Sequence, residues 1–418
     1  MSSFSKIIGN QRFQKYFGMN LTSQTAWSVT NVAIVWFVFS VTRSAIAVTI
    51  VGVAESIAAV AATLPAGVWV DRHNRRRLLI ISNGIRGASI GLLAVITASY
   101  GFNFLAVIII AVVWSAVSEL FRSTNFSILP EIVDGEELPA ANGVTQAGSS
   151  LLGSASNALG GALVAFAGAA LAFFYSTVGF AAATVLSFFI ARRPATVAQQ
   201  QKTVTERAML AEIREGFAWL VSQRGLFLLS LSATFFNFFL SIGSYFLVVY
   251  VGTGLGAGAF VFGGLLALNV LGNAIGSLLA GRTEFLASAG KAWILAGIIS
   301  GPLVLALGLL PVPLIAAVAL LAIGIVFGFG NNLWLTSAQN LVPHQMRGRY
   351  FAVDGLLSFI GGPPSIVVGG ILITVIGVLP VYELVGIALF VSALVFASAK
   401  SLWTLDGSHP VSDQVTDG

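Results

Sequence analysis

Apolar stretches of twenty residues or more recur along nearly the whole chain of 418 residues. A helix that crosses the roughly 30 Å hydrocarbon core of a bilayer needs about 20 such residues. We place twelve stretches, at residues 16–40, 45–70, 78–99, 103–127, 141–166, 168–190, 226–251, 258–281, 291–310, 313–337, 350–376 and 379–401. Their continuous apolar character, without alternation at every second residue, argues against a membrane β-barrel. The sequence therefore predicts an all-α polytopic membrane protein with twelve transmembrane helices in two six-helix bundles.

The composition places the protein surface in lipid. Hydrophobic residues make up 57% of the chain and charged residues only 9%, whereas a soluble domain carries about 25% charged residues. The sequence pI is about 9.7, but the basic residues fall in short loops and do not gather on one polar face. We therefore expect a lipid bilayer as the partner surface and no nucleic acid.

The basic residues also predict the orientation. Of the 21 Lys and Arg residues, eighteen lie in the N-terminus, the even-numbered loops and the tail. One, Arg43, lies in an odd-numbered loop, and Arg86 and Arg122 lie within spans. The positive-inside rule then places both termini in the cytoplasm of a multi-pass protein of the plasma (inner) membrane. Residues 1–15 do not resemble a cleaved signal peptide.

One polar stretch divides the chain. Residues 191–224 begin as a linker and continue as a predicted amphipathic helix over 206–223, where Met209, Ile213, Phe217 and Leu220 share one face. We expect this helix to lie at the cytoplasmic membrane surface. The predicted organisation is an N-terminal half (1–190), a linker with this helix (191–224), a C-terminal half (225–402) and a cytoplasmic tail (403–418).

The two halves repeat a glycine pattern. Gly153, Gly160, Gly161, Leu163 and Gly168 recur 209 residues later as Gly362, Gly369, Gly370, Leu372 and Gly377. Small residues at helical spacing let helices approach closely in lipid. Five matches at one offset therefore indicate a duplicated fold with equivalent packing in each half.

The sequence lacks the side chains that common membrane enzymes use. It contains no cysteine and three histidines, His73, His344 and His409, all in loops or the tail. It also contains no HExxH, GxSxG or Walker pattern. We expect neither an enzyme nor a metal site or cofactor, and no ATP hydrolysis within this chain.

The loop Gly67-Val68-Trp69-Val70-Asp71-Arg72-His73-Asn74-Arg75-Arg76-Arg77 carries a more specific signal. It resembles the cytoplasmic loop 2–3 signature of major facilitator superfamily transporters, Gly-x-x-x-Asp-Arg-x-Gly-Arg-Arg. Asn74 stands where the family has glycine, and we expect it to adopt the left-handed turn that asparagine tolerates. An ordinary basic loop obeying the positive-inside rule is the alternative.

Further motifs resemble the prokaryotic macrolide-efflux and enterobactin-exporter branch of that superfamily. They are Arg86, Phe126–Val133, Leu138–Asn142, Ile213–Leu220 and Val342–Arg349. The resemblance implies a monomeric secondary transporter that expels amphipathic small molecules, commonly in exchange for protons. Two departures concern that exchange. Ala26 and Trp27 stand where many members have an acidic residue, and Ser156–Gly161 keeps only the terminal glycines of the antiporter signature.

Glu55 is the candidate for proton coupling. A charged side chain inside a span costs about 2.5–3.5 kcal/mol on insertion scales, so each one is a functional candidate. Glu55 lies about ten residues into the second span and has no basic residue one turn away. Of the carboxylates that the sequence places in or next to the spans, Glu55 is the deeply placed one that has no basic residue nearby in sequence. A polar lining of a water-filled vestibule is the alternative.

Other charged residues are expected to control conformation. Glu119 and Arg122 are one turn apart and can pair, locking the fourth span to the loop that carries Asp71. Arg86 is expected to contact a neighbouring helix or a lipid headgroup rather than substrate. The complete set of predicted gating residues is Gly67, Asp71, Arg72, Arg75, Arg76, Glu119, Arg122, Arg347 and Arg349.

Amides within the spans predict a central cavity. Residues at spacings of four or seven share one helix face, and an unsatisfied amide in lipid is costly. The predicted cavity residues are Gln24, Asn31, Asn237, Asn269, Asn273, Asn331 and Trp334. Hydrogen bonding between helices is the alternative for each amide pair.

The substrate stays open at this level. A transporter of lysolipids or other lipids, or a uniporter, would share the fold and these features. A membrane enzyme and a non-transporting receptor agree less well with the sequence.

Overall fold

The computed structural model describes residues 3–190, 206–280, 289–343 and 346–403, and over these ranges the chain is helical with no strand. The elements are α1 (Ser3–Gly9), α2 (Gln11–Thr42), α3 (Ala45–Arg72), α4 (Arg75–Tyr100), α5 (Phe104–Ile128), η1 (Leu129–Glu131), α6 (Leu138–Ser187), α7 (Glu206–Ser222), α8 (Arg224–Tyr245), α9 (Leu247–Val249), η2 (Tyr250–Gly254), α10 (Ala259–Ala280), α11 (Ala289–Leu309), α12 (Pro313–Leu341), α13 (Arg347–Ile376), α14 (Val378–Ala397) and α15 (Lys400–Trp403).

Eleven helices in the described ranges are long and apolar enough to cross a membrane. The longest, α6, has 50 residues and is interrupted at Gly168, whose backbone is not helical (φ 83°, ψ 165°). It therefore covers two of the predicted stretches, 141–166 and 168–190, and the remaining ten helices each correspond to one. The all-α membrane fold predicted from the sequence is confirmed.

The 209-residue repeat extends to backbone conformation. Gly377, between α13 and α14, has φ 85° and ψ 166°, which matches Gly168. These dihedrals belong to a region that glycine alone enters readily. Packing repeats as well, because a Cβ at Gly160 would meet Val29 and Val32 of α2, and one at Gly369 would meet Ile242 of α8 and Phe246.

Contacts group the chain into two compact units. Unit 1 comprises Met1–Gln199 and Val251–Val270, and unit 2 comprises Gln200–Tyr250 and Leu271–Gly418. The predicted halves, 1–190 and 225–402, differ from these units in the assignment of Val251–Val270. This segment groups with unit 1 because the start of α10 packs closely on α6, where a Cβ at Gly263 would lie 2.7 Å from the Cα of Gly161.

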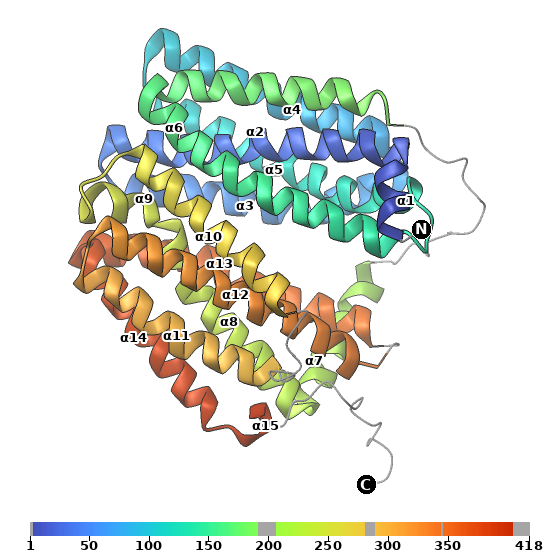
Figure 1. Ribbon diagram of the computed structural model, residues 1–418, viewed down its shortest axis with the longest axis vertical. Coiled ribbons are helices and arrows are strands. Elements are labelled where there is room, and N and C mark those ends of the chain that lie inside the picture. The colour runs from blue at the N-terminus through green and yellow to red at the C-terminus, as the bar shows by residue number, and fades with distance from the viewer. Residues whose placement is uncertain (1–2, 191–205, 281–288, 344–345, 404–418) are drawn as a thin grey trace. The chain divides into compact units, whose positions relative to one another are not determined.

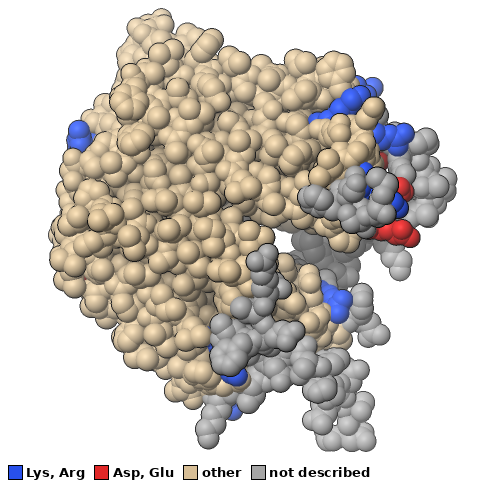
Figure 2. Space-filling view, viewed as in Figure 1, with Lys and Arg blue, Asp and Glu red and all other residues tan. Residues whose placement is uncertain are grey.

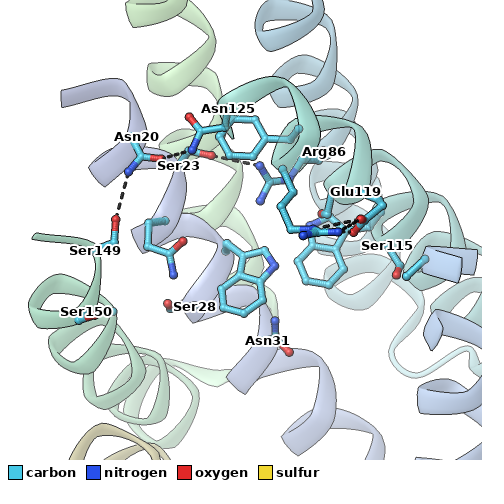
Figure 3. A pocket seen from close by; sticks show the side chains of 18 of the residues that line it. Asn20, Ser23, Ser28, Asn31, Arg86, Ser115, Glu119, Asn125, Ser149 and Ser150 are labelled. Carbon is cyan, nitrogen blue, oxygen red and sulfur yellow. Dashed lines mark hydrogen bonds and ion pairs between the residues drawn. The ribbon is translucent and has the colours of Figure 1, made fainter. Parts of the chain in front are cut away.

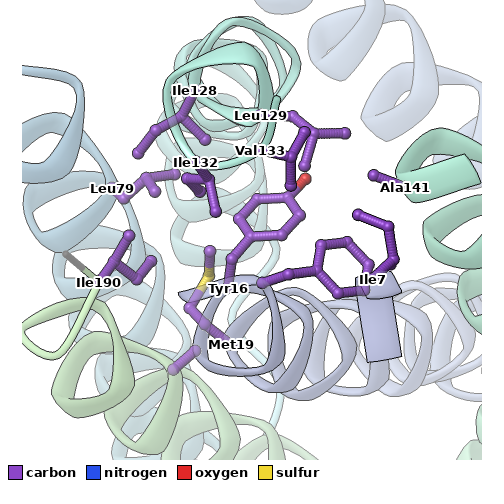
Figure 4. Close-up of a cluster of buried hydrophobic side chains, with 12 residues drawn as sticks. Ile7, Tyr16, Met19, Leu79, Ile128, Leu129, Ile132, Val133, Ala141 and Ile190 are labelled. Atoms are coloured by element: carbon purple, nitrogen blue, oxygen red, sulfur yellow. The ribbon is translucent and has the colours of Figure 1, made fainter. Parts of the chain in front are cut away.

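Helices α2, α4, α5 and α6 of unit 1 run side by side (Figure 1). A cluster of buried apolar side chains joins their ends to α1 and η1 (Figure 4). Tyr16 lies at its centre with its ring buried, and its hydroxyl donates to the backbone oxygen of Asn125 over 3.5 Å. This cluster fixes the helix ends that flank the polar interior described below.

Within unit 2, the predicted amphipathic helix is confirmed as α7. Its Leu220 is fully buried in a cluster with Tyr350 and Val353 of α13, while Phe217 is exposed. The carboxylate of Glu215 accepts a hydrogen bond from Nη1 of Arg349 over 2.6 Å. The placement of α7 at a membrane surface stays a prediction, and linker residues 191–205 and tail residues 404–418 lie outside the described part of the chain.

Charged side chains visible in Figure 2 gather at one end of unit 1, with one basic group at its opposite end and an uncharged band between them. This distribution is the one that the count of basic residues led us to expect. An uncharged band flanked by charge is typical of a protein that spans a bilayer.

A close helix crossing in unit 2 leads us to predict the effect of one substitution on stability. A Cβ on Gly276 of α10 would lie 1.9 Å from the backbone oxygen of Ile325 in α12. Gly276→Val should therefore force the helices apart, with a cost of about 1–3 kcal/mol and a lower melting temperature of the detergent-purified protein. Gly264→Val is the matched control in the same helix, because a Cβ there would meet no heavy atom within 4 Å. Equal melting temperatures for the two variants would contradict this account.

Candidate functional site

A cavity with a volume of about 690 Å³ lies among helices α2 to α6 of unit 1, and Val270 of α10 also lines it (Figure 3). Most of its lining side chains are amides or hydroxyls, with a few aromatic rings and four charged groups. The lining residues are Asn20, Ser23, Gln24, Trp27, Ser28, Asn31, Glu55, Ala59, Arg86, Trp114, Ser115, Ser118, Glu119, Phe121, Arg122, Asn125, Thr145, Gln146, Ser149, Ser150, Gly153, Asn157 and Val270. Three of the predicted cavity and coupling residues, Gln24, Asn31 and Glu55, are among them.

Amide hydrogen bonds tie three helices together along one wall of the cavity. The side-chain nitrogen of Asn20 donates to Ser149 Oγ over 3.1 Å, and the side-chain nitrogen of Asn125 donates to Asn20 Oδ1 over 3.0 Å (Figure 3). The chain Asn125–Asn20–Ser149 thus links α5, α2 and α6. Asn20 was not among the predicted cavity residues, although it lies four residues before Gln24 on the same helix face.

Arg86 of α4 is buried, with an exposed fraction of 2%. Its Nη1 donates to Ser23 Oγ over 3.1 Å and to Asn83 Oδ1 over 3.4 Å. Its guanidinium carbon lies 4.6 Å from the ring centroid of Phe121 and 4.4 Å from that of Phe180. The predicted helix-packing role is therefore present, but a buried side chain that lines a cavity does not contact a lipid headgroup.

Glu55 is half-buried in α3 and faces the cavity. Its backbone oxygen accepts a hydrogen bond from Ser115 Oγ over 2.8 Å, which fixes α3 to α5 at this level. Among the described residues, its carboxylate forms no hydrogen bond or ion pair. The carboxylate is therefore available to water or to a ligand in the cavity.

Glu119 and Arg122 of α5 pair as the spacing predicts. Arg122 Nε donates to both carboxylate oxygens of Glu119, over 3.0 and 3.1 Å, and Nη2 forms a further bond to Oε1. Thr63 Oγ1 of α3 also reaches the carboxylate, at 3.5 Å. This ion pair lines the cavity, whereas we expected it to face the loop that carries Asp71.

The arginine-rich loop is short, and it starts a helix. Asn74 does not adopt the left-handed turn that we expected, because its φ is −68° and its ψ is 111°. Its side-chain oxygen instead accepts hydrogen bonds from the backbone nitrogens of Arg76 and Arg77 at the start of α4. Asparagine is among the best residues at such a helix N-cap, a role that glycine lacks the side chain to fill.

The predicted gating residues of this loop divide into two groups. Asp71 and Arg72, in the last turn of α3, are exposed, and Gly67 lies one turn earlier. Arg75 Nη1, by contrast, donates to Glu131 Oε1 over 2.5 Å and to the backbone oxygen of Ser127 over 3.2 Å. Arg76 donates to the backbone oxygen of Phe188. The second group therefore holds the start of α4 against the ends of α5 and α6.

The other predicted cavity residues do not line this cavity. Asn237 on α8 and Asn273 on α10 are half-buried, and Asn331 on α12 is exposed. Asn269 on α10 already interacts with another group of the protein. Trp334 packs edge-on against Phe351 beside a buried cluster of unit 2.

Arg347 and Arg349, the last two predicted gating residues, lie at the start of α13. Arg347 Nε donates to the backbone oxygen of Val342 over 3.1 Å, and Arg349 pairs with Glu215 as described above. Both therefore hold the entry of α13 in place within unit 2.

Asp354 of α13 is a buried carboxylate that was not among the predicted site residues. It accepts a hydrogen bond from Ser230 Oγ over 2.9 Å and has an exposed fraction of 6%. Glu55 is therefore not the sole acid within an apolar span that could serve in coupling. The sequence signal was available, since an acidic residue within an apolar span is a functional candidate by default.

Helical bundles of this kind, with a polar cavity among transmembrane helices, are typical of transporters. The sequence model of the Major Facilitator Superfamily matches residues 16–365. The chain belongs to this superfamily. It is therefore a multi-pass membrane transporter of small molecules and not an enzyme.

A relative with an assigned activity is similar over most of the chain. The chain is 27% identical over 367 residues to the multidrug efflux pump Tap of Mycolicibacterium fortuitum, and the match covers 84% of this chain and 86% of that protein.

Solved transporter structures share the fold. A bacterial homologue of the iron transporter ferroportin in an inward-facing state matches 96% of this chain and 99% of its own, with a TM-score of 0.72 and 15% identity. A mutant of the nucleoside transporter NupG matches 93% of this chain and 99% of its own, with a TM-score of 0.75 and 13% identity. The D-xylose–proton symporter matches 96% of this chain and 100% of its own, with a TM-score of 0.70 and 13% identity. At these identities the likeness concerns the fold alone.

Proposed function

We propose that this protein exports amphipathic small molecules across the plasma membrane in exchange for protons. The observation that carries the proposal is the chemistry of the cavity wall in unit 1. Trp27, Trp114 and Phe121 offer apolar ring surface, and Gln24 and Asn31 offer adaptable hydrogen-bonding groups. In small-molecule sites, apolar and aromatic side chains receive the body of the ligand and placed polar groups fix its orientation. Likeness to the multidrug efflux pump Tap supports the same direction of transport.

Trp27 is informative in this respect. Many exporters that the chain resembles have an acidic residue about where Ala26 and Trp27 stand. Here Trp27 lines the cavity, while Ala26 is fully buried, and a Cβ on Gly179 of α6 would lie 3.0 Å from the Ala26 side chain. The first span thus contributes an aromatic surface in place of a charge, and coupling must rest on another acid.

Glu55 is the residue that we assign to coupling. Its carboxylate faces the cavity without an ion-pair partner among the described residues. A group in this position can release its proton when a ligand enters or when the cavity changes its access to water. Glu119 is less suited, since Arg122 already holds its charge.

Alternating access would connect these parts. We assign the six-helix halves at 1–190 and 225–402 to the two moving bodies, with both termini in the cytoplasm and the protein acting as a monomer. The cavity residues of the second half would be Asn237, Asn269, Asn273, Asn331 and Trp334. Rocking of two repeats about a fixed site is the usual mechanism of transporters built in this way.

Accumulation assays in a transporter-deficient host test the proposal. The panel contains ethidium as the cation, chloramphenicol as the neutral compound and deoxycholate as the anion. We expect the expressed protein to lower the accumulation of at least one of these amphiphiles severalfold. A protonophore should remove the effect. The proposal fails if no accumulation changes, and selective movement of lysophospholipid would instead assign the chain to lipid transport. An effect that survives the protonophore would favour a uniporter.

A further inference from the structure

Arg86 is a buried cation whose charge no acidic side chain of the described residues balances. Within the described part of the chain, its only hydrogen-bond acceptors are Ser23 and Asn83, both neutral, and it forms no ion pair. Its Nε is buried without a partner, and the hydrogen bonds that Arg86 forms to described residues both come from Nη1 and not from Nη2. A buried charge without a counterion is strongly unfavourable unless other groups stabilise it.

The surroundings of Arg86 stabilise it only in part. Two aromatic rings, Phe121 and Phe180, lie within 4.6 Å of the guanidinium carbon. Cation–π contacts stabilise a charge without neutralising it. Ser23 and Asn83 form a relay in which Ser23 Oγ donates to Asn83 Oδ1 over 2.9 Å, so that both oxygens orient toward Nη1. The guanidinium is thus held by Nη1, while Nε and Nη2 form no hydrogen bond to a described residue.

The other charged groups of the cavity do not neutralise Arg86. Glu119 is held by Arg122, and Glu55 is not in ion-pair contact with any described cation. Arg86 nevertheless lines the cavity, so a ligand there can reach it. A planar guanidinium with free N–H groups is well suited to a carboxylate, which it binds through parallel charge-assisted hydrogen bonds.

We infer that Arg86 forms an anion-binding subsite of the cavity, which selects amphiphiles that carry a carboxylate next to an aromatic or apolar body. The rings of Trp27, Trp114 and Phe121 receive the body. The inference rests on the proposed export function and names a class of its substrates. The carboxylate of a bound ligand would then balance the charge of Arg86.

Binding of a matched pair of fluorescent probes tests the subsite. Dansylglycine carries a carboxylate, and dansylglycinamide carries a neutral amide of almost the same size. The dansyl group of both probes accepts excitation energy from tryptophan. Because Trp27 and Trp114 line the cavity, energy transfer from tryptophan to the probe measures binding. In nanodiscs of phosphatidylcholine, we expect the wild-type protein to bind dansylglycine at least tenfold more tightly than dansylglycinamide, which corresponds to the strength of a charge-assisted hydrogen bond.

Substitution should remove this preference. Arg86→Gln should weaken dansylglycine binding at least tenfold and leave dansylglycinamide binding within about twofold, while Arg86→Lys should keep a reduced preference for the carboxylate. Arg43→Gln is the matched control, because Arg43 is exposed at the end of α2 and does not line the cavity. Loss of an unpaired buried charge should leave the fold intact, which size-exclusion chromatography checks. If Arg86→Gln fails to fold, the test uses Arg86→Lys. A preference for dansylglycine that is reduced from that of the wild-type protein then supports the inference, and an unchanged preference contradicts it.

Several outcomes would overturn the inference. They are equal binding of the two probes by the wild-type protein, absence of dansylglycine binding, or an equal loss of both probes in Arg86→Gln. Displacement of dansylglycine by added phosphatidylglycerol would assign the subsite to an anionic lipid. Export separates this inference from the proposed function, since Arg86→Gln should lose protection against deoxycholate and keep protection against ethidium. Export of ethidium without any selectivity for carboxylates would refute the subsite and leave the proposed function standing.

Discussion

Glu55→Gln should abolish uphill export while downhill equilibration of the same compound continues. Glutamine keeps the size and hydrogen-bonding capacity of the side chain, so the cavity wall among α2, α3 and α5 should stay intact. It cannot release a proton, so substrate movement would no longer be linked to the proton gradient. The measurement is concentration of the exported compound in proteoliposomes under an imposed pH gradient, followed by the same assay without a gradient.

Two companion variants make this experiment decisive. Asp354→Asn removes the buried carboxylate of α13, to which Ser230 already donates a hydrogen bond. Glu383→Gln is the control for a carboxylate in α14, outside the described cavity. If Glu55→Gln still concentrates substrate under the gradient, Glu55 is not the coupling residue. Loss of uphill export in Asp354→Asn alone would transfer that role to Asp354.

Sequence patterns were sufficient for the fold because lipid imposes strong constraints. In a bilayer core every backbone group must bond within its own segment, so an apolar stretch of sufficient length becomes a helix. The glycine repeat added detail, since Gly168 and Gly377 share one unusual backbone conformation. Periodicity alone did not show which glycines meet another backbone, as Gly276 does, because that depends on pairing between distant helices.

The candidate site was only partly predictable, for a physical reason. Spacing along one helix identified Gln24 and Asn31 as one face and Glu119 with Arg122 as a pair, and both expectations agree with the positions of these residues. The partners of Arg86 come from α2, α5 and α6, so no local pattern revealed its burial.

The departure at Asn74 follows the same rule. A family pattern with glycine led us to expect a left-handed turn, whereas the asparagine side chain caps α4 through its own hydrogen bonds. A substitution in a motif can thus exchange backbone freedom for a specific side-chain contact. Sequence resemblance locates the turn, but the chemistry of the residue present decides its geometry.

Asp71→Asn should leave insertion intact and reduce the transport rate at least tenfold. Asp71 lies in the last turn of α3, where a negative charge opposes the helix dipole and costs about 0.3–1 kcal/mol. It forms no hydrogen bond or ion pair to another described residue, so it contributes no visible stabilisation to this conformation. An acid in such a place is expected to act in another state, where it can contact the positive start of a neighbouring helix. Removing the charge would then shift the balance between inward- and outward-facing states.

Initial rates of export, normalised to protein in the membrane, check this prediction. Glu136→Gln is the matched control, since Glu136 is an exposed carboxylate between η1 and α6, outside the arginine-rich loop. Asp71→Glu should recover part of the rate, because it restores the charge on a longer side chain. A slow Asp71→Asn with a normal Glu136→Gln would show that the position of the charge matters, beyond the total charge at this end of the helices. Wild-type rates in a well-expressed Asp71→Asn protein would remove Asp71 from the gating residues and leave Arg75, with its bond to Glu131, as the structural element of the loop.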